Sequence, residues 1–478
     1  MRTVGIYSLL IAAFLLQQSC MKQQETAEWV STAPDAVWKN HSVAVTNQEE
    51  KSIKPDAEVF VDKPLQRIDG FGACFNELGW TSLSLLKEED RNAVMSELFE
   101  PGKGANFTIC RMPVGANDFS RNWYSYNETA NDFEMKNFSV ANDEETLIPF
   151  ILNAKKINPD LKIWASPWSP PAWMKTNNHY ACHPDPAVND LKGDPKINRE
   201  GSNMFIMQDK YLQAYALYFG LFIDAYKQKG INIYAVAPQN EFHSCQVFPS
   251  CLWTAESLAQ FVGKYLGPEM EKRQVEILFG TNERPDEAII DTLLTDPLAS
   301  KYIKAVGFQW GGKGAVAGIN KRYPQMKLYQ TEQECGDGKN NWDGAVHSWN
   351  LMKFYLSNGV SVYDYWNISL LEGGISRWGW AQNSLVTVDS AKKTCAYTYE
   401  YYVMKHFSHY VLPGANRLET SGDENVLAFV NPDGNTVIVA SNPTNEKRTL
   451  HIKIGNRQIA PELEAHSFNT FCIRQSKS

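Results

Sequence analysis

After its first 20 residues, the chain has no apolar run that approaches the roughly 18–20 residues needed to span a bilayer, which excludes a multi-span membrane protein. It has no long basic run either, since 46 Lys and Arg residues stand against 54 Asp and Glu and the net charge is -8. Nucleic-acid binding is therefore not expected. The sequence also lacks a CxxC pair, which argues against a zinc ribbon.

Apolar and aromatic residues, by contrast, are abundant. The chain contains 478 residues, of which 43% are hydrophobic and 12% aromatic, including 14 Trp. This composition excludes a largely disordered protein and suffices for one large domain with a smaller one. The tryptophans either belong to a large core or form a surface that stacks on something flat.

The amino terminus has the pattern of an export signal. Arg2 precedes an apolar stretch over residues 4–16, and Cys20 follows it. The pattern resembles a bacterial lipoprotein signal over residues 1–20, in which Cys20 is lipidated. It predicts an exported lipoprotein of a bacterial outer membrane that contacts the membrane only through this anchor. A secretory signal cut nearby, with Cys20 as an incidental thiol, is the alternative. Residues 21–39 are expected to form a tether.

Two short segments hold further cysteines. Cys245 and Cys251, in HSCQVFPSC, have the spacing of a local disulfide within a loop, which export would permit. His179, Cys182 and His183 lie close together in HYACHP. A polar loop explains this second segment better than a metal site does.

Eight short apolar runs, each followed by a helix-like stretch, occupy residues 66–400. This alternation predicts a closed parallel (β/α)8 TIM barrel. The runs are RIDGFGACF, NFTICRMPV, LKIWASPW, INIYAVAPQNE, QVEILFGTNE, IKAVGFQW, MKLYQTEQE and VSVYDYWN.

The helical rhythm stops after about residue 400. Strand-like segments separated by turn residues follow over 401–478, and similar segments lie at 40–65. Since both chain ends flank the barrel, we expect them to build one antiparallel β-sandwich domain beside it.

Active sites of such barrels lie at the carboxyl ends of the strands. The residues found there are carboxylates, amides, tryptophans and one arginine, without a glycine-rich phosphate loop or a histidine cluster. They are Asn76, Glu77, Arg111, Asp118, Trp168, Asn240, Glu241, Asn282, Glu283, Trp310, Glu332, Glu334, Trp366 and Asn367.

This set suits glycoside hydrolysis, which needs one protonated carboxyl and one ionised carboxyl. Glu241 and Glu332 would face each other across an eight-stranded barrel. Strand alternation places Glu334 on the same side as Glu332 and does not separate the two. Glu283 is a weaker candidate, because the neighbouring Arg284 suggests a solvated ion pair.

The remaining candidates would support these carboxylates or hold the sugar. Arg111 is expected to brace the carboxylates by charge-assisted hydrogen bonds, or else to be a buried structural arginine. Trp168, Trp310 and Trp366 either stack on sugar rings or belong to the core. His243 directly follows Glu241–Phe242 and is expected in the pocket.

At these motifs the chain resembles glycoside hydrolase family 30, whose members include acid β-glucosylceramidase. The shared stretches are GFGACFNE, RMPVGANDFS, NFSVANDEE, ASPWSPPAWMKT, AVAPQNE, YQTEQECG and YWNISLLEGG. The resemblance implies a barrel with a side β-domain, double displacement with retention, and no metal or organic cofactor.

The resemblance also assigns roles. It makes Glu241, in QNE, the acid/base and Glu332, in QTE, the nucleophile in preference to Glu334. One departure is Phe242, where the family often has Pro after the acid/base, and it bears on the leaving group rather than on the chemistry. The residues that match sugar-holding positions are Asp118, Trp168, Asn240, Trp366 and Asn383.

The expected substrate is β-1,6-glucan, which would make the protein an endo-β-1,6-glucanase. Glucosylceramide or a small β-glucoside is the first alternative, and xylan or another glycoside the next. A glycan-binding lipoprotein without activity is the alternative from another class, and the presence of both glutamates argues against it.

Overall fold

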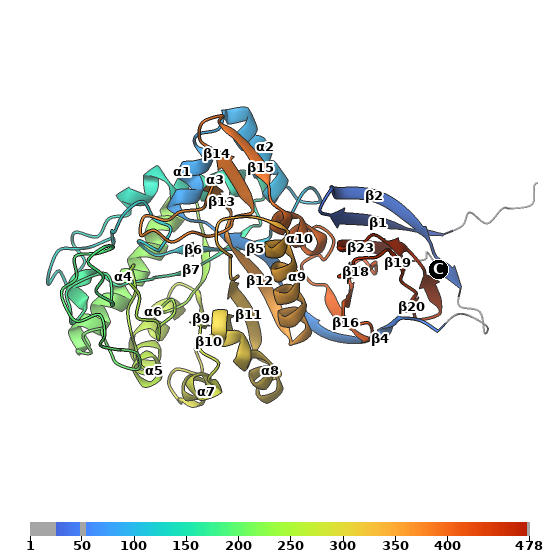
Figure 1. Cartoon of the computed structure of the whole chain (residues 1–478). Coiled ribbons are helices and arrows are strands. Elements are labelled where there is room, and N and C mark those ends of the chain that lie inside the picture. Colours follow the sequence, from blue (N-terminus) through green and yellow to red (C-terminus); the bar gives the residue numbers. More distant parts are fainter. Residues whose placement is uncertain (1–24, 48–53, 476–478) are drawn as a thin grey trace, which may run out of the picture.

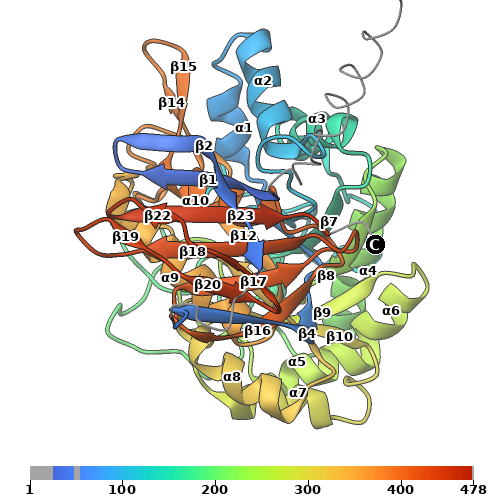
Figure 2. The same ribbon diagram turned by 90° about the vertical axis from the view of Figure 1, so that its right-hand side faces the viewer.

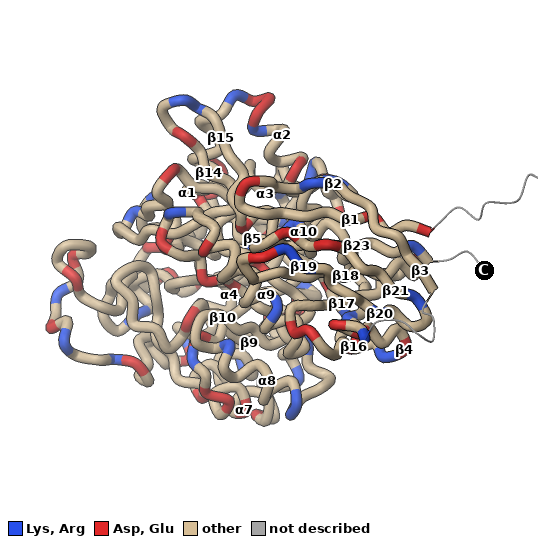
Figure 3. Tube along the Cα trace, turned by 45° about the vertical axis from the view of Figure 1, so that its right-hand side comes forward, with Lys and Arg blue, Asp and Glu red and all other residues tan. Residues whose placement is uncertain are grey.

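The computed structural model describes residues 25–47 and 54–475. A barrel lies beside a β-rich domain, and helices surround the barrel (Figure 1). Acidic and basic residues are interspersed along the chain (Figure 3). No helix in the described ranges is long and apolar enough to cross a membrane.

Each of the eight predicted runs forms a strand of one closed, parallel barrel, which confirms the expected fold. The strands are short and buried on both faces, as is usual when helices cover a parallel sheet. They are β5 (Gly70–Cys74), β6 (Ile109–Pro113), β7 (Lys162–Ser166), β8 (Ile233–Val236), β9 (Glu276–Asn282), β10 (Ile303–Gln309), β11 (Lys327–Glu332) and β12 (Val360–Asn367).

Helices follow the strands and pack their apolar faces on the barrel. Several begin where a side chain accepts the free backbone N–H of the first turn, as Asn76, Thr254, Asp286, Asn341 and Thr398 do. The helices are α1 (Glu77–Leu83), α2 (Glu88–Phe99), α3 (Leu147–Ile157), α4 (Asp209–Gln228), α5 (Ala255–Phe261), α6 (Gly267–Glu271), α7 (Glu287–Thr295), α8 (Lys313–Arg322), α9 (Trp342–Ser357) and α10 (Tyr399–Ser408). Short helical turns lie at η1 (Ala141–Glu145), η2 (Ala172–Met174), η3 (Val262–Leu266) and η4 (Trp310–Gly312).

The inside of the barrel is filled by side chains rather than open. One buried cluster takes a residue from each of seven strands: Ile109, Trp164, Ala235, Leu278, Ala305, Tyr329 and Val362. The Trp164 indole donates to Asp364 Oδ2 at 2.8 Å. This plug forms the floor of the barrel mouth.

The β-domain is one ten-stranded sheet built from both chain ends, in the order β2-β1-β23-β18-β17-β16-β4-β20-β21-β3 (Figure 2). Its strands are β1 (Thr26–Ala33), β2 (Ala36–Ala44), β3 (Thr46–Asn47), β4 (Ala57–Arg67), β16 (Asn416–Gly422), β17 (Val426–Val430), β18 (Thr436–Asn442), β20 (Ile452–Ile454), β21 (Arg457–Ile459) and β23 (Ser467–Ile473). Smaller pairings involve β13 (Ser369–Leu371), β14 (Val386–Asp389), β15 (Thr394–Tyr397), β19 (Arg448–Thr449) and β22 (Glu462–Leu463).

Successive residues of β18 point to opposite faces of this sheet. Val437 and Val439 join the large cluster that includes the barrel helices, whereas Ile438 and Ala440 join the separate core of the β-domain. The alternation of side chains along the strand therefore lets one face of the sheet pack on the barrel while the other face forms the core of the β-domain.

Two predicted boundaries are wrong. The expected tether over 21–39 is a β-hairpin from Thr26 onward, because β1 pairs with β23 from Glu28↔Cys472 to Thr32↔Phe468. Helix α10 (Tyr399–Ser408) crosses the predicted boundary at residue 400 into the segment where only strands were expected, and it packs against α9. After α10 the chain returns to the sheet of the β-domain at β16.

The spacing of Cys245 and Cys251 suits a local disulfide, but the structure has no disulfide between them. Among the described residues all eight cysteines are free, Cys245 and Cys251 included. The expected signal and the lipidated Cys20 lie outside the described residues.

Candidate active site

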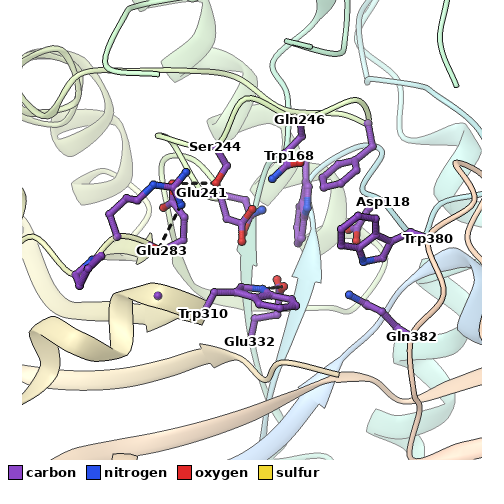
Figure 4. A pocket seen from close by; sticks show the side chains of 15 residues that line it. Asp118, Trp168, Glu241, Ser244, Gln246, Glu283, Trp310, Glu332, Trp380 and Gln382 are labelled. Carbon is purple, nitrogen blue, oxygen red and sulfur yellow. Dashed lines mark hydrogen bonds and ion pairs between the residues drawn. The ribbon is translucent and has the colours of Figure 1, made fainter. Parts of the chain in front are cut away.

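A pocket of about 400 Å³ opens at the carboxyl ends of the barrel strands (Figure 4). Its walls combine carboxylates, amides and aromatic rings. The lining residues are Asp118, Trp168, Asn240, Glu241, Ser244, Gln246, Phe248, Glu283, Arg284, Pro285, Trp310, Gly311, Glu332, Trp380 and Gln382.

Glu241 lies in the loop after β8 and has a left-handed backbone, with φ of 44°. Such a conformation costs a residue with a side chain about 1–2 kcal/mol. Hydrogen bonds on both sides offset this cost. The Glu241 N–H donates to Thr281 Oγ1 at 3.0 Å, and the Ser244 N–H donates to the Glu241 carbonyl at 2.8 Å. The backbone that carries the carboxyl is thus held in place.

Glu332 is the last residue of β11 and is held by both of its oxygens. Oε2 accepts from the Arg111 guanidinium at 2.8 Å, and Oε1 accepts from the Trp310 indole at 2.9 Å. Charge-assisted bonds of this kind fix orientation and favour the ionised carboxylate. Glu334 points elsewhere and pairs with Lys313 and His347.

Arg111, on β6, is fully buried beneath the pocket. Besides Glu332 it donates to Asn240 Oδ1 at 2.6 Å and to Ser166 Oγ at 2.9 and 3.1 Å. Its guanidinium lies 4.4–5.5 Å from the ring centres of Trp168, Trp164 and Trp366. The arginine therefore connects the carboxylate at the end of β11 with an amide in the loop after β8.

Gln309, the last residue of β10, joins the two glutamates. Its Nε2 donates to Glu241 Oε1 at 3.0 Å and to Glu332 Oε2 at 3.3 Å. The sequence reading missed this residue because Trp310, one position later, was taken as the strand end.

The surroundings separate the two carboxyls in acidity. Burial, followed by the charges on Glu332 and Glu283, raises the pKa of Glu241 well above its usual value. Burial also raises the pKa of Glu332, but Arg111 and the Trp310 indole oppose that rise. The arrangement keeps a proton on Glu241 more readily than on Glu332.

At the other end of the pocket a buried carboxyl faces aromatic rings. Asp118 lines the pocket, and its Oδ1 is buried without a hydrogen-bond partner among the described residues. Burial and then the charge on Glu332 raise the pKa of Asp118 well above its usual value. Trp168 lines the pocket and stacks on Trp366 at 5.3 Å, with Trp366 fully buried behind it.

Two expected pocket residues lie elsewhere. Asn383 does not line the pocket; its Oδ1 accepts from the backbone N–H groups of Gly338 and Asn340, because it caps a neighbouring loop. His243 does not line it either. Its ring packs on Phe242 at 4.3 Å, and only its backbone N–H contacts the site, at Glu283.

Most of the pocket residues that were not predicted from the sequence come from loops. Trp380 and Gln382 reach the pocket from the loop that also carries Asn383. Ser244, Gln246 and Phe248 come from the loop after Glu241. Such loops have no periodicity to show which side chains point inward.

Within residues 25–47 and 54–475, no group of three or more His, Cys, Asp or Glu side chains is placed to hold a metal ion. His179 instead contacts Asp190 at 2.9 Å.

Relatives of known class share this architecture. A 30% identical relative over 419 residues is a putative glucosylceramidase 1 of Caenorhabditis elegans, covering 81% of this chain and 76% of that protein. An endo-1,6-beta-D-glucanase, neg1, of Aspergillus fumigatus is 27% identical over 403 residues, or 79% and 78% of the two chains. The solved structure of the endo-beta1,6-glucanase BT3312 superposes with a TM-score of 0.80 at 25% identity, covering 95% of this chain and all of that one.

Two family models cover most of the chain. The glycosyl hydrolase family 30 TIM-barrel domain matches residues 68–411, and the family 30 beta sandwich domain matches residues 414–471. The paired carboxyls therefore lie in the barrel of a glycosidase, and the chain belongs to glycosyl hydrolase family 30.

Proposed function

We propose that the protein is a retaining β-glycosidase in which Glu241 is the acid/base and Glu332 the nucleophile. The observation that carries this proposal is the Gln309 amide nitrogen, which lies 3.0 Å from one carboxyl oxygen and 3.3 Å from the other. One oxygen of each carboxyl therefore lies within hydrogen-bond distance of the same amide nitrogen, which brings the two carboxyls close together. Retaining enzymes need such a short spacing, roughly 5–5.5 Å, whereas inverting ones keep their carboxyls further apart to admit a water.

In this mechanism protonated Glu241 donates to the glycosidic oxygen as the bond to the anomeric carbon breaks. The Glu332 carboxylate attacks that carbon and forms a glycosyl ester. Forming the ester removes the charge of Glu332, which lowers the pKa of Glu241. Glu241 then takes a proton from water, the water oxygen attacks the anomeric carbon, and Glu332 leaves as a carboxylate.

We further propose β-1,6-glucan as the substrate. The leaving group must lie at Glu241, beside which Ser244 and Glu283 line the pocket, whereas Asp118, Trp380 and Gln382 lie at the other end (Figure 4). A hydroxyl and a carboxyl next to the acid/base suit the hydroxyls of a second glucose unit. The apolar chains of a ceramide would leave both groups without a hydrogen-bond partner from the substrate.

Product release from pustulan, laminarin, xylan and glucosylceramide tests the substrate. We expect sugar release from pustulan, a β-1,6-glucan, to be fastest. Release from glucosylceramide with none from pustulan would favour the activity named for the C. elegans relative. A binding protein without catalysis would release sugar from none of them.

Two substitutions test the roles. Glu241→Gln and Glu332→Gln should each lower turnover of the preferred glycan by about a hundredfold or more. Glu334→Gln is the matched control, because Glu334 lies two residues from Glu332 yet pairs with Lys313 and His347 outside the pocket. Equal loss in all three variants would contradict the assignment.

We also propose export with a lipid on Cys20. The support is the sequence pattern, Arg2 followed by an apolar stretch and then Cys20. Mass spectrometry of the amino-terminal peptide of the protein expressed in a bacterium tests it. A lipid mass that disappears in Cys20→Ala is expected, and an unmodified Cys20 would refute it.

A further inference from the structure

Glu283 is a third carboxyl at the leaving-group end of the pocket, and the proposed reaction does not use it. It follows β9 directly and is 2% exposed. Its Oε1 accepts from the His243 backbone N–H at 3.0 Å and from Ser244 Oγ at 3.1 Å. Arg284, the adjacent cation, reaches only 4.0 Å from that oxygen and pairs with Glu200 at 2.7 Å instead. A buried carboxyl is thus directed at the loop of the acid/base, without a close ion pair.

The contacts of Glu283 continue to Glu241 through the backbone. The segment that Glu283 holds, His243–Ser244, closes a turn onto the Glu241 carbonyl through the Ser244 N–H. On the other side, Thr281 of the same strand holds the Glu241 N–H. The end of β9 therefore anchors both sides of a residue whose left-handed backbone needs external support.

We propose that Glu283 is a positioning residue for the acid/base: its carboxyl fixes the loop that aims Glu241, and its negative charge helps Glu241 keep the proton that it donates. This inference rests on the proposed role of Glu241. The charge acts on Glu241 because Glu283 lines the same pocket and is shielded from water. Burial raises the pKa of Glu283 to about 7, so its charge develops in the range where an acid catalyst of this kind must retain its proton.

Other charged groups also raise the pKa of Glu241, so Glu283 accounts for only part of the rise. Glu332 and Asp118 raise its pKa in the same direction as Glu283, and Glu332 acts more strongly. Arg284 opposes the rise in the pKa of Glu283, and the charges of Arg284, Glu200, Asp286 and Glu256 act on the neighbouring His243. Removing Glu283 should therefore shift the titration of Glu241 without abolishing its elevation.

The test compares the pH dependence of kcat/KM for the wild type, Glu283→Gln and Glu334→Gln on a β-1,6-linked glucose oligosaccharide. An amide oxygen at position 283 still accepts from His243 and Ser244, so this variant removes the charge and keeps the anchor. We expect the alkaline limit, where Glu241 loses its proton, to move down by about 0.5–1 pH unit in Glu283→Gln. Glu334→Gln should leave that limit in place.

Two further measurements make the result decisive. Ser244→Ala removes one contact of Glu283 but keeps its carboxyl, so its alkaline limit should move less than that of Glu283→Gln. A ¹³C NMR titration of the Glu241 carboxyl in the resting enzyme should show the same downward shift in Glu283→Gln, independently of turnover. An unmoved limit in Glu283→Gln, together with loss of activity in Glu241→Gln, would overturn the inference alone. Full activity in Glu241→Gln would instead overturn the proposed function.

Discussion

Replacing Arg111 by methionine should make the nucleophile harder to ionise. Arg111 is the only cation within salt-bridge distance of Glu332 among the described residues, at 2.8 Å, and both side chains are shielded from water. Burial already raises the pKa of Glu332, and Arg111 is the largest influence that opposes the rise. Without it, the acid limit of kcat/KM should move up by about 1–3 pH units, the usual effect of an arginine beside a carboxylate.

The raised pKa of Glu332 in Arg111→Met should also alter how the free energy of unfolding depends on pH. A shift of 1–3 units corresponds to about 1.4–4 kcal/mol between the two protonation states of Glu332. A carboxyl whose pKa is raised in the folded state loses its stabilising contribution as the pH rises through that pKa. The free energy of unfolding lost in Arg111→Met should therefore be smaller near pH 4 than near pH 7, where Glu332 would be charged and unpaired.

Paired pH–rate profiles and urea titrations at several pH values measure both effects. Arg111→Lys is the matched variant, because it keeps the charge but not the fork that reaches Asn240 and Ser166 as well as Glu332. It should lower kcat while leaving the acid limit closer to that of the wild type. An acid limit that does not move in Arg111→Met would refute the idea that this arginine keeps Glu332 ionised.

Three further predictions follow from single contacts. Gln382→Ala should raise KM for the glycan several-fold, because Gln382 lines the pocket. Asn383→Ala should leave KM unchanged and lower the free energy of unfolding by about 1–3 kcal/mol, because it removes two hydrogen bonds to the backbone. A raised KM in Asn383→Ala with no change in Gln382→Ala would show instead that Asn383 contacts the substrate. Thr281→Val removes the acceptor of the Glu241 N–H and a donor to Asn240, and should reduce kcat about tenfold without changing the fold, as judged by circular dichroism. Burial lowers the pKa of His406 to about 3, so below about pH 6.5 the unfolded chain binds a proton that the folded chain does not, and stability falls. In His406→Gln, Tm should therefore decline less between about pH 6.5 and pH 4. An unchanged slope of Tm against pH would show that His406 does not cause the acid sensitivity.

The barrel was predictable because its strands are buried on both faces and therefore appear as continuous apolar runs. Glu241 and Glu332 could be identified because they follow such runs, and a strand end is a fixed point in the fold. Strand β1 could not be identified in this way. Its partner β23 lies more than 430 residues away, as the Glu28↔Cys472 pairing shows, and the local sequence carries no sign of that pairing.

The parts of the site that come from loops were harder to predict. Asn383 and Gln382 are neighbours in a segment without regular structure, and the sequence does not show which of them points inward. Glu283 looked like a solvated partner of Arg284, yet the fold turns its carboxyl to His243 and Ser244 and buries it. In both cases a tertiary contact, rather than a local pattern, decides the outcome.

The pairing of β1 with β23 sets an order on folding. The first described strand has to wait for the last one to be synthesised, since β23 is the neighbour of both β1 and β18 in the sheet. Such distant contacts slow folding and leave sheet edges open until the chain is complete. A chain that ends before Ser467 would lack the strand that joins β1 and β2 to the rest of the sheet, and a frameshift just before Ser467 should therefore be as damaging to the β-domain as one near its middle.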